Sequence, residues 1–81
     1  MLDQSRMDEI KRRVDDAYLE YLSNKDTIRE YYSVVNEAYE EVSAWVLNNK
    51  HSNETARLFI ELEQRRVELA ALLGEEIEQE A

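Results

Sequence analysis

The feature that most constrains this chain is the near absence of residues that end helices. Its 81 residues include no proline and one glycine, Gly74. Proline removes a backbone donor and glycine favours left-handed turns, so the backbone has few reasons to leave the helical region. The sequence therefore predicts an all-α protein, and its length predicts a single helical domain over residues 1–81.

Apolar residues recur in alternating steps of three and four along three segments, which is the heptad period of amphipathic and coiled-coil helices. The stripes are Met7, Ile10, Val14, Ala17 and Tyr21; Ile28, Tyr31, Val35, Ala38, Val42 and Trp45; and Phe59, Leu62, Leu69 and Leu73. Polar turns are expected at residues 23–26 and 48–52. Short turns make neighbouring helices antiparallel, which predicts a three-helix antiparallel bundle made of a helical hairpin and a long third helix.

Residues that cap helix N-termini precede each stripe. They are Ser5, the Thr27–Glu30 capping box, and Ser52 or Asn53. The third helix is expected from about residue 54 to about residue 76. The favoured interpretation is that Gly74 ends it as a C-terminal cap, with residues 75–81 as an acidic tail; the alternative is that Gly74 permits a close helix crossing.

Charge narrows the range of partners. Nineteen acidic and ten basic residues give a net charge of −9. A negative field repels phosphate groups, so direct binding to nucleic acid or to anionic membranes is disfavoured. The only basic run, Lys11-Arg12-Arg13, is expected to form ion pairs four residues apart within its own helix, as in Lys11–Asp15 and Glu9–Arg13.

The residue types and segments that the sequence lacks indicate the cellular compartment of the protein. There is no cysteine, which excludes disulfides and thiolate zinc sites. The longest apolar run is five residues, 69–73, and the first ten residues have no apolar core of a signal peptide. We expect a cytoplasmic protein that neither enters a membrane nor carries a cofactor.

Catalytic motifs find little support. The Glu-x-x-His motif of di-metal bundles is absent, because residue 48, three before the only histidine, is asparagine. The pair Glu37-x-x-Glu40, with Glu41 beside it, resembles the magnesium-binding helix of the all-α nucleotide pyrophosphohydrolases of the MazG kind. That resemblance implies a second pair of the Glu-x-x-Asp type, for which Glu75-x-x-Glu78 is the nearest substitute. We therefore expect that the protein is not an enzyme, and we keep a metal-dependent nucleotide hydrolase as the second alternative.

Two features indicate binding instead. Arg66 lies on the apolar line of the third helix. One interpretation is that it snorkels or pairs with a glutamate, and the other is that it sets the helix register or binds a partner. The chain also has five tyrosines and a tryptophan, and an aromatic stripe of this kind is more often core than binding site. Five tyrosines nevertheless exceed what a small core can bury with every hydroxyl satisfied, and tyrosine and tryptophan dominate binding hot spots. We expect four rings, Tyr18, Tyr21, Tyr31 and Tyr32, to crowd the hairpin end near the first turn.

The third helix also carries a seven-residue ladder of Glu54, Glu61, Glu68 and Glu75. Such a row suggests an alternative function, a decoy that mimics nucleic acid and blocks a DNA- or RNA-binding protein. The same helix has a wide apolar arc, which predicts a homodimer, with a foreign partner as the rival. That arc contains Leu58, Phe59, Leu62, Leu69, Leu72 and Leu73.

The favoured function is a small acidic interaction protein, either an adaptor or an inhibitor, that acts by occupying the surface of a protein partner. Its size and charge are similar in general to those of small regulators encoded by phages and plasmids. The candidate interaction residues are Tyr18, Tyr21, Tyr31, Tyr32, Trp45, Arg66, Glu61 and Glu68.

Overall fold

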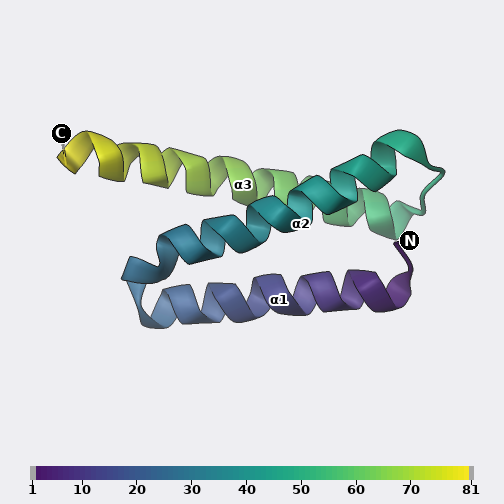
Figure 1. Ribbon diagram of the computed structural model, residues 1–81, viewed down its shortest axis with the longest axis horizontal. Coiled ribbons are helices and arrows are strands. Elements are labelled where there is room, and N and C mark those ends of the chain that lie inside the picture. Colours follow the sequence, from purple (N-terminus) through teal and green to yellow (C-terminus); the bar gives the residue numbers. More distant parts are fainter. Residues whose placement is uncertain (1, 81) are drawn as a thin grey trace.

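The chain forms three α-helices in a computed structural model that describes the backbone of residues 2–80 and the side chains of residues 2–74. They are α1 (Gln4–Ser23), α2 (Ile28–Asn48) and α3 (Asn53–Glu80), and a short 3-10 turn, η1 (Lys25–Thr27), joins the first two. Successive helices run antiparallel (Figure 1), and residues 2–80 contain no strand. The predicted all-α three-helix bundle is confirmed, and self-association remains a prediction.

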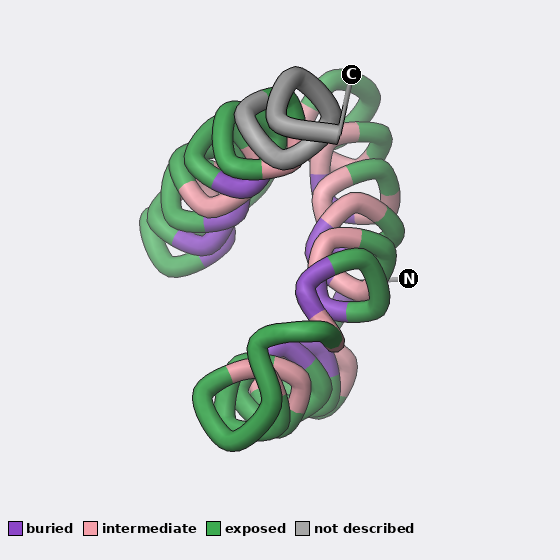
Figure 2. The backbone as a smooth tube through the Cα atoms, turned by 90° about the vertical axis from the view of Figure 1, so that its left-hand side faces the viewer, coloured by how far each residue is buried: buried purple, intermediate pink, exposed green. Residues whose placement is uncertain are grey.

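Helix α2 lies between the other two and packs against both of them. Figure 1 shows α1 and α3 close together where α1 begins, and far apart where α1 ends. Along the long axis of the bundle, the buried residues of the three helices face one another (Figure 2). The core is therefore built on α2, with α1 and α3 as its two flanks.

The core contains most of the apolar stripes that the heptad spacing predicts, with two differences. Leu2 and Leu58, outside the stripes, are buried, while the stripe residues Ala17, Tyr21, Trp45, Phe59 and Leu73 are only partly buried. The buried members of the core are Leu2, Met7, Ile10 and Val14 before the first turn, Ile28, Tyr31, Val35, Ala38 and Val42 on α2, and Leu58, Leu62 and Leu69 on α3. Val35, Val42 and Leu62 have the most completely buried side chains. Each such aliphatic side chain contributes roughly 1.5–3 kcal/mol when fully buried, so these positions carry much of the stability.

The helix caps differ in part from the prediction. Asp3, and not Ser5, caps α1, because its Oδ1 accepts a 2.8 Å hydrogen bond from the Arg6 amide. The Thr27 capping box is also wrong, since η1 occupies the turn and the Thr27 hydroxyl donates to the Asn24 carbonyl instead. Ser52 does cap α3, where its Oγ accepts a 3.2 Å bond from the Thr55 amide.

The predicted end of α3 at Gly74 is wrong. The helix continues through this residue to Glu80, and Gly74 has no positive φ angle. A Cβ built at Gly74 would meet no atom within 4 Å. Glycine lowers helix propensity by about 1 kcal/mol but does not by itself stop a helix. Residues 75–80 are thus helical, while the side chain of Glu75, in the predicted acidic ladder, lies outside the described residues.

The cations of α1 bond to other helices more than to their own. Lys11 Nζ lies 3.0 Å from Glu54 Oε1 on α3, and Arg13 lies 3.8 Å from Glu37 on α2. The pairs predicted for these two cations within α1 do not form. A lysine or arginine beside a packed neighbour can reach a carboxylate across the helix junction, and these contacts hold α1 against the other two helices.

Candidate functional site

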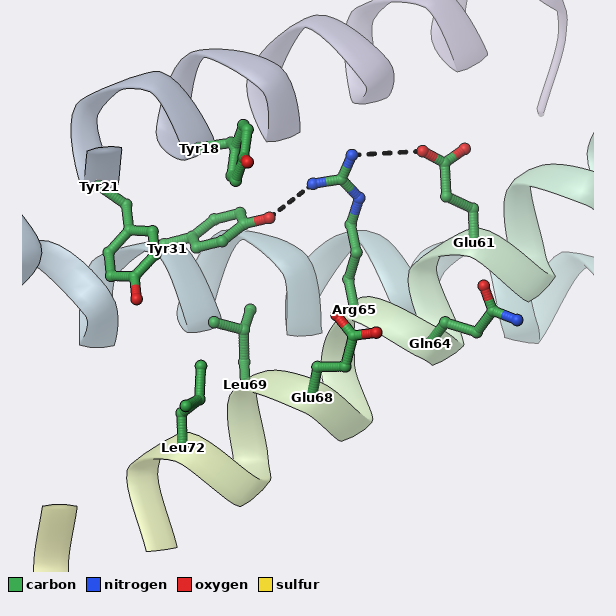
Figure 3. Close-up of a pocket in the computed structure, with 9 residues that line it drawn as sticks. All are labelled: Tyr18, Tyr21, Tyr31, Glu61, Gln64, Arg65, Glu68, Leu69 and Leu72. Atoms are coloured by element: carbon green, nitrogen blue, oxygen red, sulfur yellow. Dashed lines mark hydrogen bonds and ion pairs between the residues drawn. The ribbon is translucent and has the colours of Figure 1, made fainter. Parts of the chain in front are cut away.

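A groove of about 420 Å³ lies where the C-terminal part of α1, the start of α2 and the middle of α3 meet. We call it the aromatic groove. Three tyrosines, two leucines and four polar residues line it, as Figure 3 shows: Tyr18, Tyr21, Tyr31, Glu61, Gln64, Arg65, Glu68, Leu69 and Leu72. The residues of one wall come from the helical hairpin and those of the other from α3.

The hairpin wall is a cluster of three rings centred on Tyr31. The Tyr31 ring centroid lies 5.5 Å from that of Tyr21, in a stacked arrangement, and 5.7 Å from that of Tyr18, in a tilted one. Tyr31 is buried, with 4% of its surface exposed, whereas Tyr18 is 39% exposed. Aromatic pairs at these distances hold one another in place, so the groove presents a preformed aromatic surface.

Arg65 of α3 reaches across to this cluster. Its Nη1 donates a 2.6 Å hydrogen bond to the Tyr31 hydroxyl, and its Nη2 lies 3.4 Å from Glu61 Oε1. The guanidinium also lies 5.5 Å from the centre of the Tyr18 ring, within cation–π distance. Burial alone would lower the pKa of Arg65, but the bonds to Tyr31 and Glu61 raise it above its ordinary value.

The α3 wall combines apolar and acidic groups. Leu69 is buried and Leu72 is 43% exposed, and both point toward the tyrosine cluster (Figure 3). Glu68 and Glu61 supply two carboxylates to this wall against the one guanidinium of Arg65. A smaller hollow of about 110 Å³ adjoins it between α1 and α3 and adds the carboxylate of Asp15 and the ammonium group of Lys11, which is bonded to Glu54. Beside the hairpin wall, Lys25 Nζ lies 4.4 Å from the centre of the Tyr21 ring. The groove is therefore apolar at its base and mixed in charge along its rim, with two carboxylates and one cation on the α3 wall.

Most of the predicted interaction residues meet at this site. Five line the aromatic groove: Tyr18, Tyr21, Tyr31, Glu61 and Glu68. Tyr32 and Trp45 do not line it, since they are half-buried and pack against the core. The expected crowd of four rings is thus a cluster of three.

Arg66 also lies outside the groove, at the junction of α2 and α3. Its Nε donates a 2.9 Å hydrogen bond to Asn36 Oδ1, and its guanidinium lies 4.6 Å from the centre of the Tyr39 ring. Of the alternatives predicted for Arg66, the pairing with a glutamate does not form among the described residues, because an amide and a ring of α2 satisfy this half-buried cation. The sequence did not single out Arg65, although its position four residues after Glu61 was a visible signal.

Two of the four residues of the predicted acidic ladder are engaged within the chain. Glu54 accepts hydrogen bonds of 3.0 Å from both Gln4 and Lys11, which lower the pKa of this carboxyl. Glu61 is bonded to Arg65. Two carboxylates held by neighbours do not form the continuous unpaired row that a mimic of the phosphate backbone needs.

The acids proposed for metal binding also have separate partners. Hydrogen bonds from Arg6 lower the pKa of Glu41, Glu37 lies near Arg13, and Glu40 accepts a bond from Asn36. Within the part of the chain that the structure describes, no three aspartate, glutamate, histidine or cysteine side chains gather as a metal site. The side chains of the second predicted pair, Glu75 and Glu78, lie outside the described residues. Within the described residues, nothing in the geometry favours the hydrolase alternative.

The wide apolar arc of α3 is mostly covered by the chain itself. Leu58, Leu62 and Leu69 are buried, Phe59 and Leu73 pack partly against the core, and only Leu72 of the six stays largely exposed. The structure thus weakens the original reason for a homodimer. Two other apolar side chains of α3, Ile60 and Val67, are 52% and 61% exposed on its outer side.

Comparisons with known proteins add no family to this picture. No family model, curated protein or solved structure matches the chain. None of the helices within residues 2–80 combines the length and apolar character needed to cross a membrane. The class that the structure itself defines is a small acidic three-helix bundle with an open aromatic groove.

Proposed function

We propose that this protein is a small interaction module that binds a partner protein through the aromatic groove. One observation carries the proposal: Tyr18 and Leu72 leave 39% and 43% of their surface exposed on different walls of one 420 Å³ hollow. Large apolar side chains that converge on a concave surface are typical of binding sites rather than of ordinary solvated faces.

The composition of the groove supports binding of a protein. Tyrosine and arginine are enriched among interface residues that contribute most of the binding energy, and the groove holds three tyrosines around Arg65. Because Tyr31 and Arg65 are already fixed by a hydrogen bond, a partner would meet an ordered surface and would lose less conformational freedom on binding.

The lining favours occupation of a partner over catalysis. It contains no histidine, serine or cysteine to serve as base or nucleophile, and Glu61 is already bonded to Arg65. An adaptor or an inhibitor needs only this surface. We place the activity in the cytoplasm, since a chain without cysteine does not depend on an oxidising compartment for its stability.

Paired variants test the groove directly. The double variant Tyr18→Ala/Leu72→Ala removes the two large apolar side chains that are exposed in the groove. Leu47→Ala is the control, because Leu47 is 81% exposed and lies outside the groove. Each protein is used to capture partners from the lysate of its native cell, after circular dichroism has shown equal helix content. We expect the groove variant to recover at least tenfold less of the partner than the control does. Equal recovery by the two variants would refute the proposal.

A further inference from the structure

We infer that the occupant of the aromatic groove is an amphipathic helix of about three turns that carries lysine or arginine beside its apolar face. The inference rests on the proposed function and names the partner's chemistry. Two features of the groove support the inference, which are apolar side chains at its base and carboxylates along its rim. The groove lies at the end of the bundle where α1 and α3 separate.

The form of the guest follows from backbone hydrogen bonding. The groove is walled by helices, whose main-chain groups are already paired, and the described chain has no strand edge to which an extended peptide could add. A buried peptide backbone must satisfy its own donors and acceptors. A helix does this internally, so helix-in-groove recognition suits this site and strand addition does not.

The length of the bound helix follows from the extent of the groove wall that α3 forms. The α3 residues that line the groove extend from Glu61 to Leu72. Twelve helical residues span about 17 Å, or roughly three turns. A guest helix of that length would present apolar side chains at spacings of three and four residues to the tyrosines and to Leu69 and Leu72.

The charge of the guest follows from the rim. Glu61 and Glu68 lie on the α3 wall, and Asp15 lies in the adjoining hollow. Among the described residues, no ion pair reaches Glu68 or Asp15. Arg65 shows how this surface receives a cation, because its guanidinium rests near the Tyr18 ring and binds a carboxylate. A basic guest could use the remaining carboxylates in the same way.

A second copy of this chain is a poorer occupant. Each copy carries a net charge of −9, so docking would bring two negative surfaces together. Two of the ten cations of each copy, Arg6 and Lys11, are already bonded to Glu41 and Glu54, which leaves fewer to offset this repulsion. Complementary charge therefore favours a foreign basic helix.

Three synthetic peptides of 14 residues test the inference. The first has leucines at helical spacing with lysine elsewhere, the second replaces each lysine by glutamate, and the third is a scrambled lysine peptide without an apolar face. Each is titrated into the full ¹⁵N-labelled chain, and amide shifts are followed by NMR. We expect the lysine peptide to shift signals around residues 18–21 and 69–72 and to bind at least tenfold more tightly than either of the others.

Two matched variants show which carboxylates matter. Glu68→Gln should weaken binding of the lysine peptide about threefold or more, while Glu63→Gln, which removes the same charge from α3 outside the groove, should leave affinity nearly unchanged. Equal effects of the two variants would show that only net charge matters, and would overturn the inference.

The remaining outcomes separate this inference from the proposed function. Equal binding of the glutamate peptide, or no groove shifts from the lysine peptide at millimolar concentration, refutes the basic helix. If groove variants still lose their captured partner, the proposed function survives that result. Light scattering that gives twice the 9.6 kDa monomer mass, with Leu72→Glu restoring the monomer, would place a second copy in the groove and also overturn the inference.

Discussion

The two ends of the bundle use the same heptad pattern for different purposes. At the closed end, where α1 and α3 begin, Thr55 is buried and donates to Met7 Sδ at 3.2 Å, and Lys11 joins α1 to Glu54. At the open end, Tyr18 and Leu72 remain exposed across a groove. The helices are bonded to one another at one end and leave a groove between them at the other.

The difference arises from helix length and divergence more than from composition. Helix α3 has 28 residues, against 20 in α1 and 21 in α2, so its last turns lack an equally long partner. Because α1 also separates from α3 toward its own C-terminal end (Figure 1), Tyr18 and Leu72 are left exposed there. An uninterrupted apolar stripe can thus provide stability at one end of a helix and a binding surface at the other.

The largest expected contrast is between two leucines of α3. Leu62→Ala should lower the free energy of unfolding by about 2–4 kcal/mol, because Leu62 is 1% exposed and its loss leaves a cavity. Leu72→Ala in the groove should lower it by less than about 1 kcal/mol, since this side chain is 43% exposed. Chemical denaturation measures both, and similar losses would show that the open end contributes to the core after all.

A smaller contrast is expected between two threonine hydroxyls. Thr55→Val removes a buried hydroxyl that bonds to Met7 and Ser52, and should cost about 1 kcal/mol. Thr27→Val removes a hydroxyl in the first turn whose acceptor, the Asn24 carbonyl, can bond to water instead. We expect its cost to be less than half as large. Thermal or denaturant unfolding of the two variants decides the order, and the reverse order would contradict a tighter closed end.

The smallest expected change in the free energy of unfolding concerns the bond between Arg6 of α1 and Glu41 of α2 at the closed end. Arg6 Nε donates to Glu41 Oε2 at 2.6 Å, which lowers the pKa of the Glu41 carboxyl below its ordinary value of 4.5. A lowered pKa in the folded state stabilises the fold above the ordinary value, and this contribution is lost as pH falls through the lowered one. Wild type should therefore exceed Glu41→Gln in stability near pH 7 by less than about 1 kcal/mol, because the pair is partly exposed.

The pH dependence of that difference is the test. The excess stability of wild type should stay constant down to about pH 5 and shrink at lower pH. Wild type and Glu41→Gln share all their other acidic residues. The difference between their free energies of unfolding therefore cancels the effect of protonating those residues at low pH. Glu40→Gln, which deletes a neighbouring carboxylate bonded to Asn36, is the control and should show no comparable shrinkage. A constant difference down to pH 2 would mean that the Arg6–Glu41 bond does not stabilise the fold.

The sequence predicted the helices and nearly the whole core, because burial repeats with the helical period and few residues interrupt it. It also placed Tyr18, Tyr21 and Tyr31 together, since they flank one short turn. It singled out Arg66 instead of Arg65 because adjacent helical positions point about 100° apart. Which of the two meets the rings depends on how α3 crosses α2, and the heptad register does not determine that angle.

The local errors have a common physical origin. The predicted roles of Thr27 and Gly74 came from residue preferences of about 1 kcal/mol or less. At Thr27 the geometry of η1 outweighed the capping preference, because Asn24 supplied both the side-chain acceptor for the Asp26 amide and the carbonyl for the Thr27 hydroxyl. Preferences of this size are decided by tertiary surroundings, which are not visible in the sequence.

Gly74 makes the open end accessible to chemistry that the natural chain lacks. Its position is helical with no positive φ angle, and a side chain there would meet no atom within 4 Å. Since the chain has no cysteine, Gly74→Cys would introduce a single thiol two residues beyond Leu72. One fluorophore or spin label attached there would report the arrival of a guest at the groove without disturbing the side chains that receive it.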